Sequence, residues 1–417
     1  MRHPSYIGRE SALDSHTRTS VTILRVKPIV DVRGSTTKAV DLKGELEGLL
    51  GESLGQCRAR ESRAFATIAD VNRPLVLFGA GGLGRKVLQA LRGAGIEPVA
   101  FADNRLAGQM VEGIGVLTPA EAAQRYRHSA TFVVTIWASW ADTMQQQSES
   151  LRRLGCRCVV SFIPLLWSFP ELLPHVQVDL PSRVLERRDE VMQCFGMWAD
   201  DDSRREFLAQ IRWRMWGDFA CLNPPLPNQY WQADVLQLPR EAVFVDAGAF
   251  DGDTLEGFVR YTNGQFRVAY AFEPDPQNML ALRGRVRGMP EEIRGRIHAF
   301  EQAVAGQQAQ ISFQSGSGAS SCLGPGEMSV SCVALDDAIP EPPHFIKYDI
   351  EGSELLGLRG TRQWISTAQP ALAVCAYHLQ EHVWQVPLLI HSFHPGYRYY
   401  LRPHGQIWET VCYAVPR

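Results

Sequence analysis

Two patterns of apolar and polar positions alternate along the chain: short unbroken apolar runs, and longer stretches in which apolar residues recur at helical spacing. The clearest run is VFVDAGAFDGDT at residues 243–254, where three apolar residues precede Asp246 and a turn that contains glycines. An unbroken run is typical of a strand covered on both faces, as in a parallel sheet. The pattern therefore predicts a buried strand, a tight turn and the start of a helix.

The same order of strand, turn and helix occurs earlier in the chain. LVLF at residues 75–78 predicts a strand, residues 86–91 predict a helix, and a second strand ends at Asp103. Between this unit and the later one, large apolar residues at 183–218 follow helical spacing. We therefore predict an α/β fold with two doubly wound Rossmann-like domains and a helical linker. The predicted order is an N-terminal arm and helix at residues 1–70, a Rossmann-like domain of nucleotide-binding type at 71–170, the helical linker or extension at 171–236, and the second doubly wound domain at 237–417.

Charge and cysteine content limit the function classes. The 42 basic and 45 acidic residues give a net charge of −3, which offers no electrostatic case for binding nucleic acid. Nine cysteines without a CxxC pair favour a reduced, cytoplasmic setting. The N-terminus lacks an apolar segment and prolines interrupt the longest apolar stretches, so we expect neither a signal peptide nor a membrane span.

The first glycine turn has the spacing of a nucleotide site. Gly79, Gly81 and Gly84 complete GxGxxG after the strand, and Asp103 lies 19 residues beyond Gly84, where an acid is expected to bind ribose hydroxyls. A degenerate unit that serves packing or partner contact fits the same residues. Hydride transfer is the weakest option, because no catalytic group is evident beside the turn.

Residues 73–165 resemble the N-terminal Rossmann-like domain of PglD-type sugar O-acyltransferases and other nucleotide-sugar proteins. The GAGG turn that begins at Gly79 and the later Asp103–Asn104 pair carry this resemblance. It implies a nucleotide or nucleotide-sugar as the ligand of this domain, if the domain binds one.

The second glycine turn differs in charge from a dinucleotide site. Gly248 and Gly252 allow the backbone to turn tightly and to approach a ligand. Asp246, Asp251 and Asp253 would repel a phosphate, whereas they suit a ligand with a positive centre and free hydroxyls. S-adenosylmethionine has these properties, so the turn predicts a methyl-donor site.

Acids recur at the ends of the following strands. Glu273 follows the apolar run in VAYAFEPDP and is expected to bind ribose hydroxyls, because strand ends line one crevice in a doubly wound sheet. Glu301 or Gln302, near a third strand at residues 297–303, is expected either to bind the adenine amino group or to be solvated. Asp349 ends a further strand and is expected to face the reacting groups, since an acid there is otherwise costly.

Three features near these strands each leave two interpretations. Glu351 and Glu354 stand at a turn and helix start, where they act near the acceptor or cap the helix. The polar, glycine-rich run at residues 314–326 is typical of a flap over substrate or of an exposed hairpin. Tyr230 and Trp231, in the loop before the buried strand, cover a ligand or pack on the sheet.

The ordered set VDAGAFDGDT, FEPDP, AVAG, LDD and IKYDIEGSE resembles the FkbM family of S-adenosylmethionine-dependent methyltransferases, over about residues 185–417. The resemblance implies a class I, seven-stranded methyltransferase sheet and methyl transfer to an oxygen, often a sugar hydroxyl. The chain departs from the general class I turn GxGxG, because Phe250 stands at the middle glycine. The predicted donor-binding residues are Asp246, Gly248, Phe250, Asp251, Gly252, Asp253, Thr254, Glu273, Pro274, Glu301, Gln302 and Asp349.

Methyl transfer to a hydroxyl also requires that the hydroxyl lose its proton. His378 follows a predicted strand at residues 372–376 and is the first candidate base, because its unperturbed pKa suits the task; Asp349 is the second. A structural role for His378 stays open. The tail holds four further histidines, His382, His391, His394 and His404. Their irregular spacing predicts packing or solvated side chains and no metal site.

The leading hypothesis is an S-adenosylmethionine-dependent O-methyltransferase that acts on a hydroxyl of a saccharide or a glycosylated natural product. Its expected partners are that acceptor and, as an open option, a second copy of the chain. The alternatives are a nucleotide-sugar-binding or assembly protein with a non-catalytic methyltransferase-like half, and an NAD-dependent oxidoreductase built on the first glycine turn.

Overall fold

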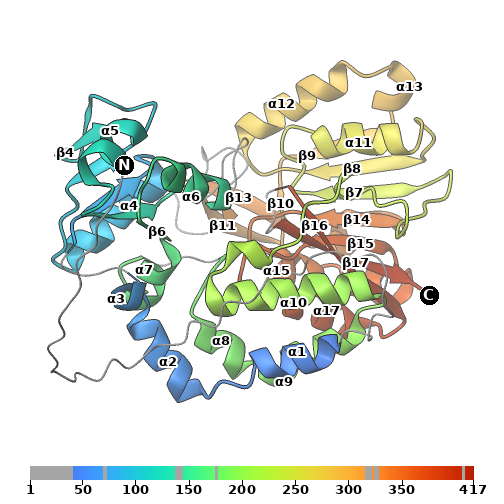
Figure 1. The fold of residues 1–417 in the computed structure, drawn as a ribbon. Coiled ribbons are helices and arrows are strands. Elements are labelled where there is room, and N and C mark those ends of the chain that lie inside the picture. Colours follow the sequence, from blue (N-terminus) through green and yellow to red (C-terminus); the bar gives the residue numbers. More distant parts are fainter. Residues whose placement is uncertain are drawn as a thin grey trace, which may run out of the picture. The chain divides into compact units, whose positions relative to one another are not determined.

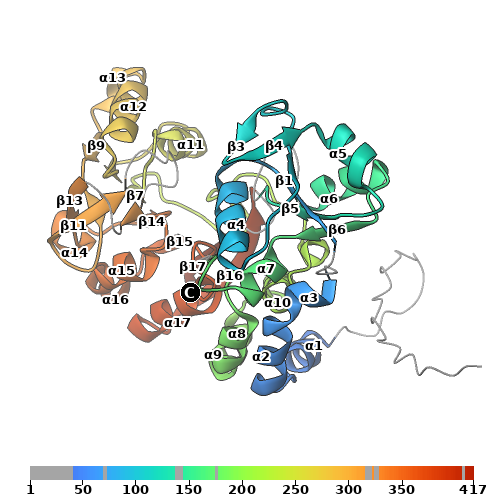
Figure 2. The same cartoon turned by 90° about the vertical axis from the view of Figure 1, so that its left-hand side faces the viewer.

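Two largely parallel sheets with flanking helices make up most of the fold (Figures 1 and 2). The computed structural model describes residues 41–68, 73–136, 144–173, 177–314, 322–323, 328–405 and 409–417. The expected N-terminal arm and most of the glycine-rich run lie outside the described residues. None of the helices in the described ranges is long and apolar enough to cross a membrane.

The first sheet has six strands in the order β3-β4-β2-β1-β5-β6. β1 pairs in parallel with β2 on one side and β5 on the other, so the strand order reverses beside β1 and its carboxyl end is a switch point. Its strands are β1 (Leu75–Phe78), β2 (Ala100–Ala102), β3 (Met110–Val111), β4 (Ile114–Leu117), β5 (Thr131–Val134) and β6 (Cys158–Ser161). The helices between them are α4 (Gly82–Gly93), α5 (Pro119–Tyr126) and α6 (Met144–Arg153).

The second sheet has seven strands in the order β16-β17-β15-β14-β7-β8-β9. Only β17 runs antiparallel to both of its neighbours, and the strand order reverses beside β7. Its strands are β7 (Val243–Ala247), β8 (Val268–Phe272), β9 (Ile297–Phe300), β14 (Phe345–Tyr348), β15 (Ala371–Cys375), β16 (Tyr397–His404) and β17 (Glu409–Pro416). The predicted fold class, α/β with two doubly wound sheets of which the second has seven strands, is confirmed.

The remaining described elements are shorter or lie outside these sheets. A four-stranded sheet contains β10 (Ala303–Val304), β11 (Ala309–Gln314), β12 (Cys322–Leu323) and β13 (Met328–Val333). The predicted third strand at 297–303 is therefore two strands, since β9 ends at Phe300 and β10 joins the smaller sheet. The other helices are α1 (Leu42–Leu49), α2 (Leu54–Ser62), α3 (Ala64–Ile68), α7 (Ile163–Ser168), α8 (Pro181–Glu186), α9 (Arg188–Met197), α10 (Asp201–Trp216), η1 (Phe219–Cys221), α11 (Asp253–Tyr261), α12 (Pro276–Arg287), α13 (Glu291–Arg294), α14 (Leu335–Ala338), α15 (Glu354–Arg359), α16 (Arg362–Thr367) and α17 (His382–Phe393).

β7 is buried on both faces, which explains its unbroken apolar run. On one face Val243 and Val245 pack in an apolar cluster to which α1, α9, α10 and α17 also contribute. On the other face the Phe244 ring stacks on Phe345, with centroids 5.4 Å apart, and lies 4.5 Å from the Phe258 ring. The strand therefore has no solvent face on which polar residues could alternate with apolar ones.

Helix α10 is joined to the loop between β15 and α17 by a buried polar network. Arg214 donates through Nε to the carbonyl oxygen of Gln380, at 2.9 Å, and through Nη1 to Gln210 Oε1, at 2.6 Å. Gln210 Nε2 in turn donates to Glu206 Oε1 at 2.9 Å, and Asn223 Nδ2 donates to Glu206 Oε2 at 2.7 Å. Burial raises the pKa of Glu206 to about 7, against the lowering effect of these two donors.

This shift predicts that stability falls as the pH rises. The folded chain keeps a proton on Glu206 that the unfolded chain, with an ordinary pKa near 4.3, releases, so the stabilisation present at low pH is lost between about pH 4 and pH 7. We expect this group to remove about 3 kcal/mol over that window. Denaturant unfolding at a series of pH values, with the wild type and Glu206→Gln, measures it. Parallel pH profiles for the two proteins would show the expectation to be wrong.

Candidate active site

The turn after β7 requires its glycines. Gly248 has a φ of 79°, and a Cβ atom built there would lie 1.9 Å from the carbonyl oxygen of Asp349. Gly252 has a φ of 89° and stands directly before α11. Phe250, at the middle position where the general turn has glycine, also takes a left-handed φ of 46°. The turn thus keeps a glycine-like backbone at this position, at a local cost of roughly 1–2 kcal/mol.

Asp246 is held by a buried lysine that sequence reasoning missed. Lys347 Nζ lies 3.0 Å from Asp246 Oδ1, and both side chains are almost completely buried. Lys347 Nζ also donates to the carbonyl oxygen of Gly248, at 2.5 Å. Burial opposes the charge on Lys347, but Asp246 and then Asp349 outweigh burial and raise its pKa. Burial raises the pKa of Asp246 to about 6, although Lys347 lowers it, so both groups are charged at neutral pH.

A second cation changes the charge of the turn. Arg285 on α12 forms ion pairs with Asp251 and with Glu256, and its Nε donates to the backbone carbonyl of Asp251 at 2.9 Å. Asp253 is exposed in the first turn of α11. Asp246 and Asp251 are therefore both paired with cations, and the turn carries less net negative charge than the sequence predicted.

Glu273 connects the ends of β7 and β8. Its Oε2 accepts the backbone N–H of Phe250 at 2.9 Å, and its Oε1 accepts the N–H of Asp275 at 2.9 Å. Burial raises the pKa of Glu273, and these donors oppose the rise. The carboxylate lies against the glycine turn and keeps acceptor capacity for further donors, because each oxygen has two lone pairs.

Thr254 and Pro274 lie next to residues of the second glycine turn and Glu273 in the chain. Glu301 and Gln302 instead contact Arg283 and Ser331. Thr254 is buried in the first turn of α11, and Pro274 directly follows Glu273. Glu301 is exposed and lies 3.3 Å from Arg283 Nη1. Gln302 Nε2 donates to Ser331 Oγ at 3.4 Å. Their role at an adenine stays a prediction.

Asp349, Glu351 and His378 converge beyond the end of β14. His378 Nε2 lies 3.3 Å from Asp349 Oδ1 and 3.5 Å from Glu351 Oε1. The Tyr230 hydroxyl donates to the other Asp349 oxygen, Oδ2, at 2.7 Å. Burial raises the pKa of Tyr230 far above its ordinary value, so this hydroxyl stays protonated and remains a donor. The three side chains Asp349, Glu351 and His378 are called the acid–imidazole cluster below.

Glu354 orients the imidazole of this cluster from its other side. It is completely buried, it lies 2.8 Å from His378 Nδ1 and 3.1 Å from His382 Nδ1, and it accepts the N–H of Ile350 at 3.0 Å. Burial alone would raise the pKa of Glu354, but His378 and His382 outweigh burial and lower it. Burial disfavours a charged His378, but Glu354 and Glu351 outweigh it and raise the pKa of the imidazole. Surface capping, one of the two interpretations of Glu354, is therefore wrong.

The two aromatic residues before β7 have different roles. Trp231 packs on the sheet, with its ring 5.7 Å from that of Phe244 and 5.4 Å from that of Tyr261. Tyr230 instead reaches the acid–imidazole cluster, and Lys347 Nζ lies 5.4 Å from its ring centroid. Lys347 could have been recognised in the sequence as a buried charge, because it interrupts the apolar residues of β14.

His391, His394 and His404 each contact residues outside the acid–imidazole cluster. His404 contacts the carbonyl oxygen of Leu226 through Nδ1 and the Tyr413 hydroxyl through Nε2, each at 3.0 Å. His394 Nε2 lies 2.9 Å from Gln369 Nε2, and the His391 ring packs 6.3 Å from the Tyr399 ring. These contacts agree with packing roles for His391, His394 and His404.

The first glycine turn has the backbone geometry of a nucleotide-binding loop. Gly79 has a φ of 113°, and a Cβ atom at Gly84 would lie 2.0 Å from the Gly79 carbonyl oxygen. A Cβ atom at Gly81 would meet no atom within 4 Å, so space remains where a pyrophosphate approaches in such folds. Asp103 accepts the N–H of Ala80 at 3.0 Å. The four predicted residues thus lie around one turn, and binding there stays a prediction.

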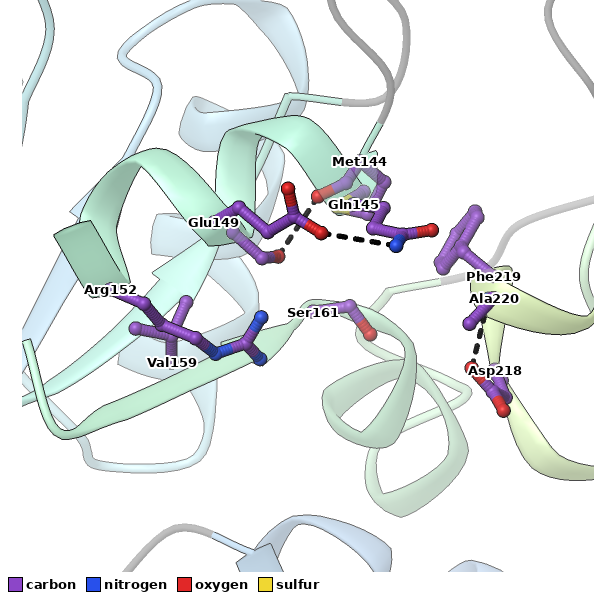
Figure 3. Close-up of a pocket in the computed structure, with 11 residues that line it drawn as sticks. Met144, Gln145, Glu149, Arg152, Val159, Ser161, Asp218, Phe219 and Ala220 are labelled. Atoms are coloured by element: carbon purple, nitrogen blue, oxygen red, sulfur yellow. Dashed lines mark hydrogen bonds between the residues drawn. The ribbon is translucent and has the colours of Figure 1, made fainter. Parts of the chain in front are cut away.

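A separate cavity of about 300 Å³ contains none of the predicted site residues. It lies between α6, β6 and the segment that begins at Gly217 (Figure 3). In this view Gln145 points toward Glu149, to which its amide donates at 3.1 Å. The cavity is lined by exposed residues such as Arg152 and Asp218 and by buried ones such as Met144 and Val159, and it is distinct from both glycine turns.

Comparisons with known proteins agree with this geometry. Residues 246–407 match a family model described as the methyltransferase FkbM domain, so this part of the chain is similar to methyltransferase domains of that type. The chain is similar to the crystal structure of methyltransferase FkbM from Methylobacillus flagellatus KT, with a TM-score of 0.75 and 21% identity over 90% of this chain and 99% of that one. At this identity the likeness shows a shared fold, which confirms the methyltransferase-type sheet.

Two further solved structures match less of the chain. An rRNA methylase from Streptococcus thermophilus has a TM-score of 0.29 and 15% identity over 45% of this chain and 92% of that one. A precorrin-6y C5,15-methyltransferase from Geobacter metallireducens GS-15 has a TM-score of 0.28 and 13% identity over 44% and 84%. No curated protein sequence matches the chain.

The close approach of Gly84 to the carbonyl oxygen of Gly79 can be tested by substitution. Gly84→Ala places a methyl group against the Gly79 carbonyl, whereas Gly81→Ala, the matched control, meets open space at a helix N-cap. We expect Gly84→Ala to lower the free energy of unfolding by about 1–3 kcal/mol and the control to change it by less than about 1 kcal/mol. Denaturant unfolding measures both. An equal effect of the two substitutions would contradict the described packing.

Proposed function

We propose that the chain is an S-adenosylmethionine-dependent O-methyltransferase. The observation that carries this proposal is the contact between the two halves of the site: the backbone of Gly248 packs directly on that of Asp349. A donor bound on the glycine turn therefore has the acid–imidazole cluster beside it. The match of residues 246–407 to the FkbM methyltransferase domain supports the same reaction class.

The donor is proposed to lie along the carboxyl ends of β7 and β8. Glu273 offers its carboxylate to the ribose hydroxyls, and Gly248 and Gly252 supply the positive φ that the turn beside it requires. Asp246 does not meet solvent, so its part is to fix the turn through Lys347 rather than to bind the donor directly. Asp251 and Asp253 stand at the outer side of the turn.

The acceptor hydroxyl is proposed to enter from the side of the acid–imidazole cluster. Its oxygen attacks the methyl carbon as the carbon–sulfur bond breaks, and the sulfur keeps that electron pair and becomes a neutral thioether. The hydroxyl proton passes to the cluster: Asp349 is within reach, and His378 accepts the proton in those molecules in which its imidazole is neutral, because Glu354 and Glu351 raise its pKa. Orientation of oxygen, methyl and sulfur in line can account for about 7–11 kcal/mol of the barrier.

A saccharide or a glycosylated small molecule is the proposed acceptor class, in line with the resemblance of the sequence to the FkbM family. The alternative, a nucleotide-sugar-binding or assembly protein, draws on the open space at Gly81 and requires no methyl donor. An NAD-dependent oxidoreductase is less favoured, because the sequence shows no catalytic group beside the first glycine turn.

Calorimetry with S-adenosylmethionine tests the donor site. We expect wild type to bind the donor and Glu273→Gln to bind it about 10- to 100-fold more weakly, because hydrogen bonds to a charged acceptor are worth about 1.5–3 kcal/mol. Glu292→Gln, which removes an exposed acid on α13, is the control and should bind as wild type does. Absence of donor binding by the wild type would exclude the proposed function and favour the assembly protein.

Substitution of His378 tests the acceptor side. Once a screen of saccharides with methyl-labelled donor has found an acceptor, we expect His378→Gln to lower kcat by about 10²–10⁴-fold, the usual contribution of acid–base groups. Its Kd for the donor should stay within threefold of wild type. His298→Gln, at an exposed position on β9, should leave kcat unchanged. A wild-type kcat in His378→Gln would remove the imidazole from the mechanism.

A further inference from the structure

We propose that Asp349, Glu351 and His378 bind one divalent metal ion. The expectation from sequence was that the tail holds no metal site, because the histidines there are irregularly spaced. The geometry instead selects one histidine and two acids, which come from the ends of two different strands. One ligand atom from each of the three lies within 4.8 Å of the others.

The distances between these atoms match the edges of a coordination shell. His378 Nε2 is 3.3 Å from Asp349 Oδ1 and 3.5 Å from Glu351 Oε1. Around an ion with bond lengths of about 2.1 Å, neighbouring ligand atoms lie about 3.0 Å apart in octahedral geometry and about 3.4 Å apart in tetrahedral geometry. Two of the three edges of the cluster thus have lengths found around an ion, and the third, between Asp349 and Glu351, is at most 4.8 Å.

Two of the three ligand atoms are buried without a hydrogen bond. Among the described residues, neither Asp349 Oδ1 nor His378 Nε2 has a hydrogen-bond partner, and the His378 side chain is only 4% exposed. Such atoms are rare, because a buried polar group without a partner costs about 1–3 kcal/mol. The two atoms lie 3.3 Å apart, and a cation bound between them would satisfy both.

Neighbouring residues orient the ligands as in established metal sites. Glu354 lies at His378 Nδ1, which directs the Nδ1 proton to the carboxylate and leaves the Nε2 lone pair for an ion. The Tyr230 hydroxyl donates to Asp349 Oδ2 and leaves Oδ1 free. If Asp349, Glu351 and His378 only shared a proton, Asp349 and His378 would not each need a further buried partner. They have such partners in Tyr230 and Glu354.

The turn after β14 brings the third ligand back toward the imidazole. Glu351 takes a left-handed φ of 51° and Gly352 a φ of 97°. A non-glycine residue in this conformation stores strain, and such residues concentrate at functional sites. The Glu351 side chain is 26% exposed, so the cluster has a side that solvent and ions can reach.

Two carboxylates with one imidazole suit an ion such as Mn²⁺, since carboxylates favour Mg²⁺, Ca²⁺ and Mn²⁺ while imidazole favours later transition metals. Three protein ligands leave further positions for oxygens of a bound molecule. Resting on the proposed function, we infer that the acceptor carries two neighbouring oxygens, one of which is methylated. Such an ion would lower the pKa of a bound hydroxyl, whose proton would pass to solvent water; His378 would then hold the ion, and this role would replace that of proton acceptor under the proposed function.

Titration of Mn²⁺ into the full chain, stripped with a chelator, tests the site. Loss of the free-ion signal in electron paramagnetic resonance measures binding, and we expect one saturable site per chain. Glu351→Gln and His378→Gln should each weaken it at least tenfold, and Glu354→Gln, which disturbs only ligand orientation, by about 10- to 100-fold. Glu381→Gln removes an acid three residues from His378 and is the control, expected to bind as wild type does.

A second measurement identifies the imidazole directly. Pulsed spectra of bound Mn²⁺ should show coupling to a nitrogen nucleus in wild type, and His378→Gln should lose that coupling. Because Glu351 is partly exposed, Glu351→Gln is expected to fold, and circular dichroism checks each variant. Absence of saturable binding in wild type, or equal binding by wild type, Glu351→Gln and His378→Gln, would overturn the proposal.

Calorimetry with S-adenosylmethionine distinguishes failure of the metal site from failure of the proposed methyltransferase function. Donor binding without Mn²⁺ binding would remove the metal site and leave the methyltransferase proposal standing. Mn²⁺ binding with the expected variant pattern, but without donor binding, would keep the metal site and remove the proposed reaction, and the inference about the acceptor with it.

Discussion

The buried ion pair between Asp246 and Lys347 is the interaction on which both sides of the candidate site depend. The two residues face each other in the register of β7 and β14, and removal of one partner would leave an unpaired charge in the core, at a cost of about 3–5 kcal/mol. The same ammonium group binds the Gly248 carbonyl and lies over the ring of Tyr230, which in turn holds Asp349. One buried cation thus links the glycine turn to the acid–imidazole cluster.

The same backbone arrangement occurs in both sheets. In each sheet a glycine turn follows the central strand, and an acid at the end of the next strand accepts an N–H from that turn: Asp103 from Ala80 and Glu273 from Phe250. This likeness follows from the doubly wound topology, in which neighbouring strands present their carboxyl ends at one edge. The turns therefore show where ligands can bind. The reaction depends on what lies beside them, and the acid–imidazole cluster lies beside the second turn.

Much of the fold could be predicted because local physics and tertiary structure agree. The apolar runs of β1 and β7 indicate strands buried on both faces, and glycines at positive φ indicate tight turns. The placement of Glu273 and Asp349 at one edge could be inferred too, because parallel strands bring their ends together. The role of Glu354 could not be inferred, since a glutamate at the start of a helix is typical of an exposed cap unless the neighbouring histidines are known to be buried with it.

The sequence by itself determined the two α/β units, their glycine turns and the acids at the strand ends, because these depend on residues close together in the chain. Only the tertiary structure decided which charges meet. Lys347 is 101 residues from Asp246 and Tyr230 is 119 residues from Asp349, and no spacing rule relates such pairs. Strand order and register bring them into contact, and burial then sets their protonation and strength. The chemistry proposed for this protein depends on these long-range contacts.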